Sequence, residues 1–117
     1  MTASPSTPRG LSAAGRRLWK SVLDTYELDQ HEELLLLQAA RTADRLEDIA
    51  TGLVGEPLTV SNARGDLVAH PLLNEQRQQA LTLSRLLASL RLPSGDEAER
   101  PQRRGGARAP YGIRGAV

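Results

Sequence analysis

The side chains in this sequence that could do chemistry are the basic ones near its two ends. Residues 1–20 carry a charge of +4 and residues 100–117 carry +5, both without an acid, whereas residues 21–99 carry −8. Basic segments around an acidic middle are typical of nucleic-acid contact, because guanidinium and ammonium groups bind phosphate oxygens. The candidate DNA-binding residues are Arg9, Arg16, Arg17, Lys20, Arg100, Arg103, Arg104 and Arg108. The alternative is that these charges only keep the termini solvated.

The sequence contains no arrangement that is typical of catalysis or metal binding. It has no cysteine and no GxxxxGK[ST] phosphate-binding loop, and its two histidines are far apart. Asp44 and Asp48 follow Arg41 and Arg45 by three residues, a spacing that suits ion pairs on an exposed helix face. We therefore expect no enzymatic activity, no cofactor and no metal site.

Helices are the elements that must position the basic residues, because leucine and alanine dominate and the chain has one Trp, two Tyr and no Phe. Ser12 is a good N-cap, and the apolar residues that follow lie on one face, which predicts a first helix from about Ala13 to Tyr26. Asp29 and Glu32 have the spacing of a capping box. They predict the start of a second helix that ends near Leu53, ahead of glycine and proline.

A third helix is predicted from about Leu72 to Leu92, opened by Pro71 and stabilised at its start by His70. Its apolar seam has coiled-coil-like spacing and consists of Leu73, Ala80, Leu83, Leu87 and Leu90. The second helix carries four consecutive leucines, which point all round it and cannot all be buried by one short chain. This predicts self-association. The candidate oligomer-interface residues are Leu34, Leu35, Leu36, Leu37, Leu83, Leu87 and Leu90.

Between the second and third helices, residues 57–70 predict a short β-hairpin, because β-compatible runs flank a turn-forming segment. A lone hairpin is marginal in water, so it should pack on the helices or on a neighbouring subunit. We expect one helical domain over residues 11–93, a disordered leader over 1–10 and a disordered Arg- and Gly-rich tail over 94–117.

Nothing in the sequence indicates a membrane protein or a secreted one. No apolar run approaches the roughly 20 residues of a membrane span, and the first ten residues lack the apolar region of a signal peptide. The expected location is the cytoplasm, with no membrane partner.

Two ordered patterns run through the helical part of the chain. The pattern "aG..lW..v...y.l...e..lL..a...aDrl" lies within residues 14–49, and "HPll.e.r.....l..ll..L.Lp" follows the turn at 62–65 and covers His70 to Pro93. Their order and combination resemble the small terminase subunits of tailed bacteriophages. The matching residues of the first pattern are Gly15, Leu18, Trp19, Val22, Tyr26, Leu28, Glu32, Leu36, Ala39, Ala43, Asp44 and Leu46.

This resemblance implies a non-catalytic protein that forms a homo-oligomeric ring, its wall built from the second and third helices as an antiparallel hairpin. It further implies recognition of the packaging site on double-stranded phage DNA in the cytoplasm of the bacterial host. The DNA would be delivered to the large terminase subunit, the ATPase and nuclease that packages it into the procapsid. One alternative is a small dimeric helical transcriptional regulator that binds DNA, and another is an assembly adaptor without DNA contact.

Overall fold

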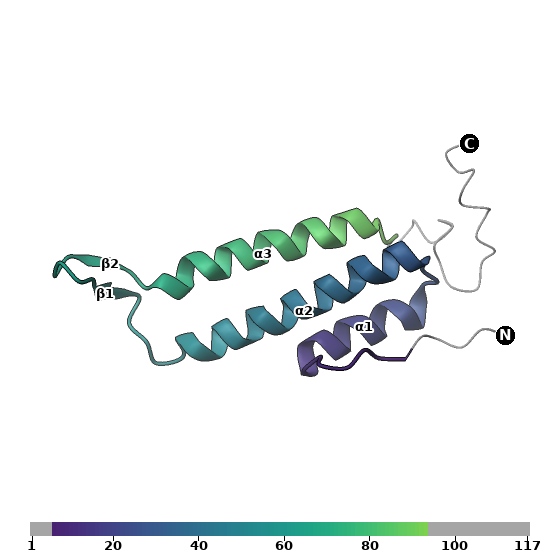
Figure 1. The fold of residues 1–117 in the computed structure, drawn as a ribbon, viewed down its shortest axis with the longest axis horizontal. Coiled ribbons are helices and arrows are strands. Elements are labelled where there is room, and N and C mark those ends of the chain that lie inside the picture. Colours follow the sequence, from purple (N-terminus) through teal and green to yellow (C-terminus); the bar gives the residue numbers. More distant parts are fainter. Residues whose placement is uncertain (1–5, 94–117) are drawn as a thin grey trace.

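The computed structural model describes residues 6–93 of the 117-residue chain. In chain order, the elements are α1 (Ala13–Thr25), α2 (Gln30–Leu53), β1 (Thr59–Ser61), β2 (Leu67–Ala69) and α3 (Pro71–Leu90). α2 and α3 run antiparallel side by side, and α1 packs against the first half of α2 (Figure 1). The predicted mainly helical architecture, with a hairpin between the second and third helices, is therefore confirmed.

The predicted starts of α2 and α3 are explained by their caps. The Asp29 N–H donates to Glu32 Oε1 at 2.7 Å, and the Asp29 side chain accepts the Glu32 N–H, which completes the predicted capping box. Pro71 occupies the first turn of α3, and the Leu72 N–H donates to His70 Nδ1 at 3.1 Å. His70 thus satisfies a backbone donor that a helix start leaves open, as predicted. α3 ends at Leu90 and is capped by Arg91, which has a left-handed backbone with φ 53°.

The hairpin is held by its turn. β1 and β2 pair antiparallel with Val60 opposite Val68. The Asn62 side-chain oxygen accepts the N–H groups of Arg64 and Asp66 at 2.9 and 3.0 Å, and Gly65 supplies the positive φ of 87° that the turn requires. The sequence predicts that the hairpin packs either on the helices of its own chain or on a neighbouring subunit. The first of these predictions is wrong, because the hairpin does not pack on its own helices. Its strands are only three residues long and project past the ends of α2 and α3 (Figure 1).

The core lies at the end of the molecule where all three helices meet. Its fully packed residues are Leu11, Trp19, Val22, Leu23, Leu36, Ala40 and Leu90. Two of the predicted interface leucines, Leu36 and Leu90, are 0% exposed, so they hold this chain together and offer no surface to another. Leu34 points outward instead and is 59% exposed. Ala80, predicted in the seam of α3, is also exposed, because this part of α3 faces only α2.

Candidate nucleic-acid interface

The surface that carries the basic residues is organised by one acid, Asp44, in the middle of α2. Its two carboxylate oxygens accept the N–H groups of Ser12 and Gly15, each at 2.7 Å. These donors belong to the N-terminal end of α1, where backbone N–H groups lack partners within the helix. The Ser12 side chain makes no capping hydrogen bond, so Ser12 does not act as the side-chain cap that its sequence position predicts. A negative charge at this end also interacts favourably with the helix dipole.

Gly15 allows this contact because it has no side chain. A Cβ at this position would lie 2.5 Å from Asp44 Oδ2 and 2.7 Å from the backbone oxygen of Ala40. α1 and α2 therefore approach one another so closely at Gly15 that only glycine fits. The consequence is a fixed orientation of α1 and of its outward basic side chains relative to α2.

We predict that Asp44→Ala lowers the free energy of unfolding by about 1–2 kcal/mol, the usual cost of removing a helix cap. Urea denaturation followed by circular dichroism at one protein concentration measures it. Asp48→Ala is the matched control, since Asp48 is exposed, lies on the same helix and carries the same charge. An equal loss in both variants would mean that the charge of Asp44, and not its contact with α1, matters.

Because Asp44 is engaged with α1, it does not form the predicted ion pair with Arg41. Within residues 6–93, neither Arg41 nor Arg45 forms an ion pair, so the predicted pairing of Arg45 with Asp48 is also absent. Both arginines are exposed and lie one helical turn apart on α2. We call this pair the α2 arginine ridge. The sequence did not predict this ridge. An acid follows each of the two arginines by three residues, and this spacing predicted ion pairs that would neutralise both arginines.

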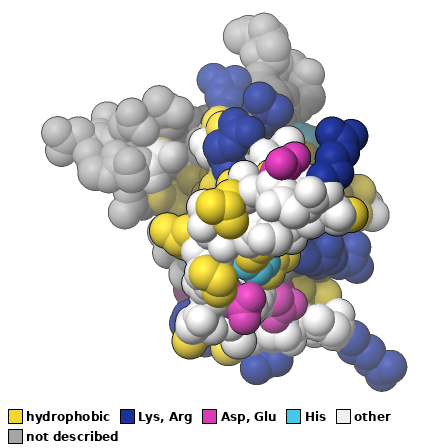
Figure 2. Space-filling view, turned by 90° about the vertical axis from the view of Figure 1, so that its left-hand side faces the viewer, with side chains coloured by type: hydrophobic (Ala, Val, Ile, Leu, Met, Phe, Trp, Pro, Cys, Tyr) yellow, Lys and Arg dark blue, Asp and Glu magenta, His cyan; other side chains and the backbone are white. Residues whose placement is uncertain are grey.

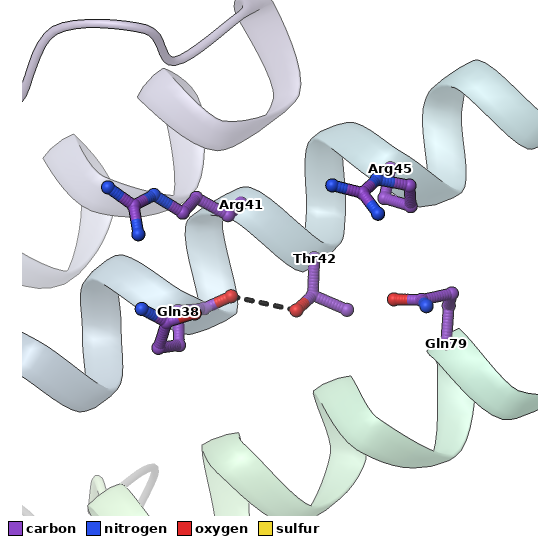
Figure 3. Close-up of a pocket in the computed structure, with 5 residues that line it drawn as sticks. All are labelled: Gln38, Arg41, Thr42, Arg45 and Gln79. Carbon is purple, nitrogen blue, oxygen red and sulfur yellow. Dashed lines mark hydrogen bonds between the residues drawn. The ribbon is translucent and has the colours of Figure 1, made fainter.

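The α2 arginine ridge separates two shallow depressions. The first has a volume of about 350 Å³, lies between α2 and α3, and is lined by Gln38, Arg41, Thr42, Arg45 and Gln79 (Figure 3). In this depression the Thr42 hydroxyl donates to the Gln38 backbone oxygen at 2.7 Å. The remaining polar groups of the lining are the side-chain amides of the two glutamines and the guanidinium groups of the two arginines (Figure 3). The second depression adjoins the start of α1 and is lined by Gly10, Ser12, Arg41, Asp44, Arg45 and Asp48.

Four of the predicted DNA-binding residues lie in the described part of the chain, and all four are exposed: Arg9, Arg16, Arg17 and Lys20. Arg16 donates to the Leu11 backbone oxygen at 2.6 Å, which holds its guanidinium beside the segment that borders the second depression. Lys20 pairs with Asp24 at 3.4 Å, but both side chains are more than half exposed, so the pair contributes little. The other four, Arg100, Arg103, Arg104 and Arg108, lie outside the described residues.

Gly10 and Ser12 line the second depression together with the α2 arginine ridge. Arg9 precedes Gly10 in the chain, and Arg16 donates to Leu11, which lies between Gly10 and Ser12. Exposed guanidinium groups on two packed helices can bind the phosphate oxygens of a nucleic acid, which give affinity and orientation but little sequence information. The Asp44 carboxylate keeps its negative charge, and together with the exposed Asp48 it offsets part of the positive charge beside the second depression.

Other kinds of site find no support in residues 6–93. That part of the chain holds no group of three or more histidine, cysteine, aspartate or glutamate side chains placed to bind a metal. None of its helices combines the length and the apolar character that crossing a membrane requires. Comparisons of the chain with protein-family models, curated proteins and solved structures give no match.

Proposed function

We propose that this chain is a small terminase subunit of the tailed-bacteriophage type, which oligomerises, binds packaging-site DNA and delivers it to a large terminase subunit. The observation that carries the proposal is that residues of the family-like patterns contact each other in the fold. Gly15 and Asp44, from opposite ends of the first pattern, are hydrogen-bonded at 2.7 Å. The Tyr26 hydroxyl, from the first pattern, donates to the backbone oxygen of Pro93, the last residue of the second.

These contacts give the resemblance a physical basis. Each pattern alone is a common helical spacing, but positions that touch in three dimensions constrain one another. Trp19, Val22 and Leu36, also from the first pattern, are buried in the shared core. The patterns thus describe one packing arrangement of three helices, which supports a common fold with the small subunits that they resemble.

Self-association is supported by the open half of the α2–α3 pair. Of the seven leucines of α3, only Leu90 is buried, whereas Leu81 is exposed and the other five are half-buried. On α2, Ile49 is the only apolar residue beyond Ala40 that is buried. A two-helix layer cannot cover its own apolar side chains, and a neighbouring copy would cover them. We propose that this open half forms the wall of the ring.

In the proposed mechanism, DNA phosphates contact the basic residues of α1 and the α2 arginine ridge. Each subunit supplies only a few such contacts, and a ring multiplies them through avidity, so no single subunit needs a strong site. Preference for a packaging site then comes from the energy of bending the DNA along the ring, which depends on its sequence. The arginines of residues 100–117 are a second candidate DNA surface or a contact for the large subunit.

A dimeric regulator would need α2 as its recognition helix. α2 is packed between α1 and α3 and carries Glu32 and Glu33 in its first turn. Both features disfavour insertion into a DNA groove, where the recognition helix must be accessible and is repelled by phosphates if acidic. We therefore place this alternative second.

Native mass across a range of protein concentrations tests the proposal. We expect a single closed oligomer well above a dimer, whose mass stays constant over the range. A monomer or a dimer at every concentration would contradict the ring and favour the dimeric regulator. Light scattering and native mass spectrometry both give the required masses. Because the two methods use different salt conditions, dissociation of the oligomer by one set of conditions would be recognised from the other.

A further inference from the structure

The end of the molecule that carries the β-hairpin exposes an unusual share of apolar side chains. Among residues 6–93, six large apolar side chains are exposed, and four of them are here: Val54 at 77%, Leu58 at 64%, Leu67 at 75% and Val68 at 37%. We call these four the hairpin patch. Figure 2 looks onto this end of the molecule and shows apolar side chains around a histidine and acids. Leu67 and Val68 are consecutive in β2, so their side chains lie on opposite faces of the hairpin, and both faces present apolar surface. Exposed apolar surface gathered at one end of a molecule marks an interaction site in a stable protein.

The hairpin also has backbone N–H and C=O groups that point away from its partner strand, along both outer edges of the sheet. The Asn62 N–H donates to the Asp66 oxygen, and the His70 N–H to the Leu58 oxygen. Bonded pairs alternate with non-bonded pairs in an antiparallel ladder, so Thr59 and Ser61 turn their N–H and C=O groups away from β2. Leu67 and Ala69 turn theirs away from β1. Both outer edges of this two-stranded sheet can therefore accept another strand.

We infer that the hairpin patch docks on the hairpins of further copies of this chain, with the free β1 edge of one copy beside the free β2 edge of the next. This inference rests on the ring of the proposed function and adds to it a place and a mode of contact. Two different edges on one element allow the same contact to repeat around a closed ring, so every hairpin gains two neighbours. Each then belongs to a larger sheet, which removes the marginal stability of an isolated hairpin.

A second copy fits the patch better than other occupants do. Four side chains cover much less than the roughly 800 Å² per partner of a stable interface, so the patch needs to continue into a larger contact. Leu53, Leu72 and Leu73, at the ends of α2 and α3 next to the hairpin, are only half-buried and supply that continuation. The described residues end at Pro93, at the end of the molecule opposite the hairpin (Figure 1). The sequence after Pro93 is rich in glycine, which does not favour an added strand.

The test is native mass of the full chain with Leu58→Lys and Leu67→Lys combined. Both side chains are exposed, so the variant should fold normally by circular dichroism. Neighbouring copies that cover the faces of the hairpin would have to bury the two ammonium groups, which opposes docking. We expect the protein concentration at half-dissociation to rise about tenfold or more. Ala13→Lys with Ser21→Lys is the matched control, because it adds the same charge on exposed positions of α1 at the other end. It should leave the mass unchanged.

Cross-linking gives a second readout, which is clean because the chain has no cysteine. Adjacent hairpins would place equivalent residues about 10 Å apart, the width of two strands. A bismaleimide of similar reach should therefore link Thr59→Cys chains into covalent oligomers and leave Ala13→Cys chains single. An unchanged oligomer in the double lysine variant, or an absence of cross-links in Thr59→Cys, overturns the inference and leaves the proposed function standing. If the double lysine variant loses the oligomer, the inference is supported. If the wild-type protein at the same time binds no DNA, the proposed function is contradicted while the inference stands.

Discussion

Replacing Gly15 with alanine is expected to lower the free energy of unfolding by about 2–5 kcal/mol. The added methyl group would lie 2.5 Å from Asp44 Oδ2 and 2.7 Å from the backbone oxygen of Ala40. The carboxylate can rotate away, but the Ala40 oxygen belongs to α2 and cannot, so α1 must move outward. Overpacking of this kind costs about 1–3 kcal/mol, and loss of the Asp44 cap adds about 1–2 kcal/mol.

The sign of this effect makes the experiment informative. In an ordinary helix interior, glycine to alanine stabilises by up to about 1 kcal/mol, because alanine has the higher helix propensity. Gly52→Ala is the matched control, since its Cβ would meet only the side chain of Leu72, at 3.3 Å, which can shift. Urea denaturation of both variants at one protein concentration should show a large loss for Gly15→Ala and a change within about 1 kcal/mol for Gly52→Ala. A gain in stability at Gly15 would contradict the close approach of α1 and α2.

The helices could be predicted from the sequence because their signals are local. The capping box at Asp29 and Glu32, the proline at the start of α3 and the apolar spacing act within a few residues of each other. The structure accordingly begins and ends each helix within two residues of the prediction. The hairpin was predictable for the same reason, since Asn62 and Gly65 form its turn through contacts four residues apart at most.

The candidate site was less predictable because it depends on contacts between distant residues. Asp44 and Gly15 are 29 positions apart, and nothing near Asp44 shows that its carboxylate is engaged by α1 rather than by Arg41. The state of the α2 arginine ridge follows from that long-range contact. The four consecutive leucines are a similar case: periodicity placed all of them around the helix, but only packing against α1 and α3 decides that Leu36 is buried and Leu34 exposed.

Reversing the charges of Arg16 and Arg17 together, by Arg16→Glu and Arg17→Glu, is expected to weaken binding to double-stranded DNA by about tenfold or more. Both side chains are exposed on α1, and each phosphate that a basic residue neutralises adds about 0.9 to the slope of log affinity against log salt. Losing two contacts in each engaged subunit should therefore also flatten this slope by about 1.8 per subunit. Fluorescence anisotropy with labelled duplex over several salt concentrations measures both quantities.

Two further pairs of substitutions locate the binding surface. Arg77→Glu with Arg85→Glu makes the same change of net charge on exposed positions of α3, so it controls for the overall field of the protein. Arg41→Glu with Arg45→Glu reverses the α2 arginine ridge. If the α2 arginine ridge and α1 contact the same DNA, the α1 pair and the ridge pair of substitutions should each flatten the salt dependence of binding. The α3 pair should change the affinity little. Circular dichroism excludes unfolding, which matters for Arg16 because it also donates to the Leu11 backbone oxygen.

The pattern of losses separates the two basic regions of the chain. Weakening by the α1 and ridge pairs, but not by removal of residues 94–117, assigns DNA contact to the described helices and leaves the arginines of the C-terminal segment for another partner. The reverse pattern assigns DNA contact to Arg100, Arg103, Arg104 and Arg108, and the helices then serve assembly. Unchanged affinity in all three would contradict DNA binding through either basic region, and it would leave the assembly adaptor as the best account of a helical, self-associating chain.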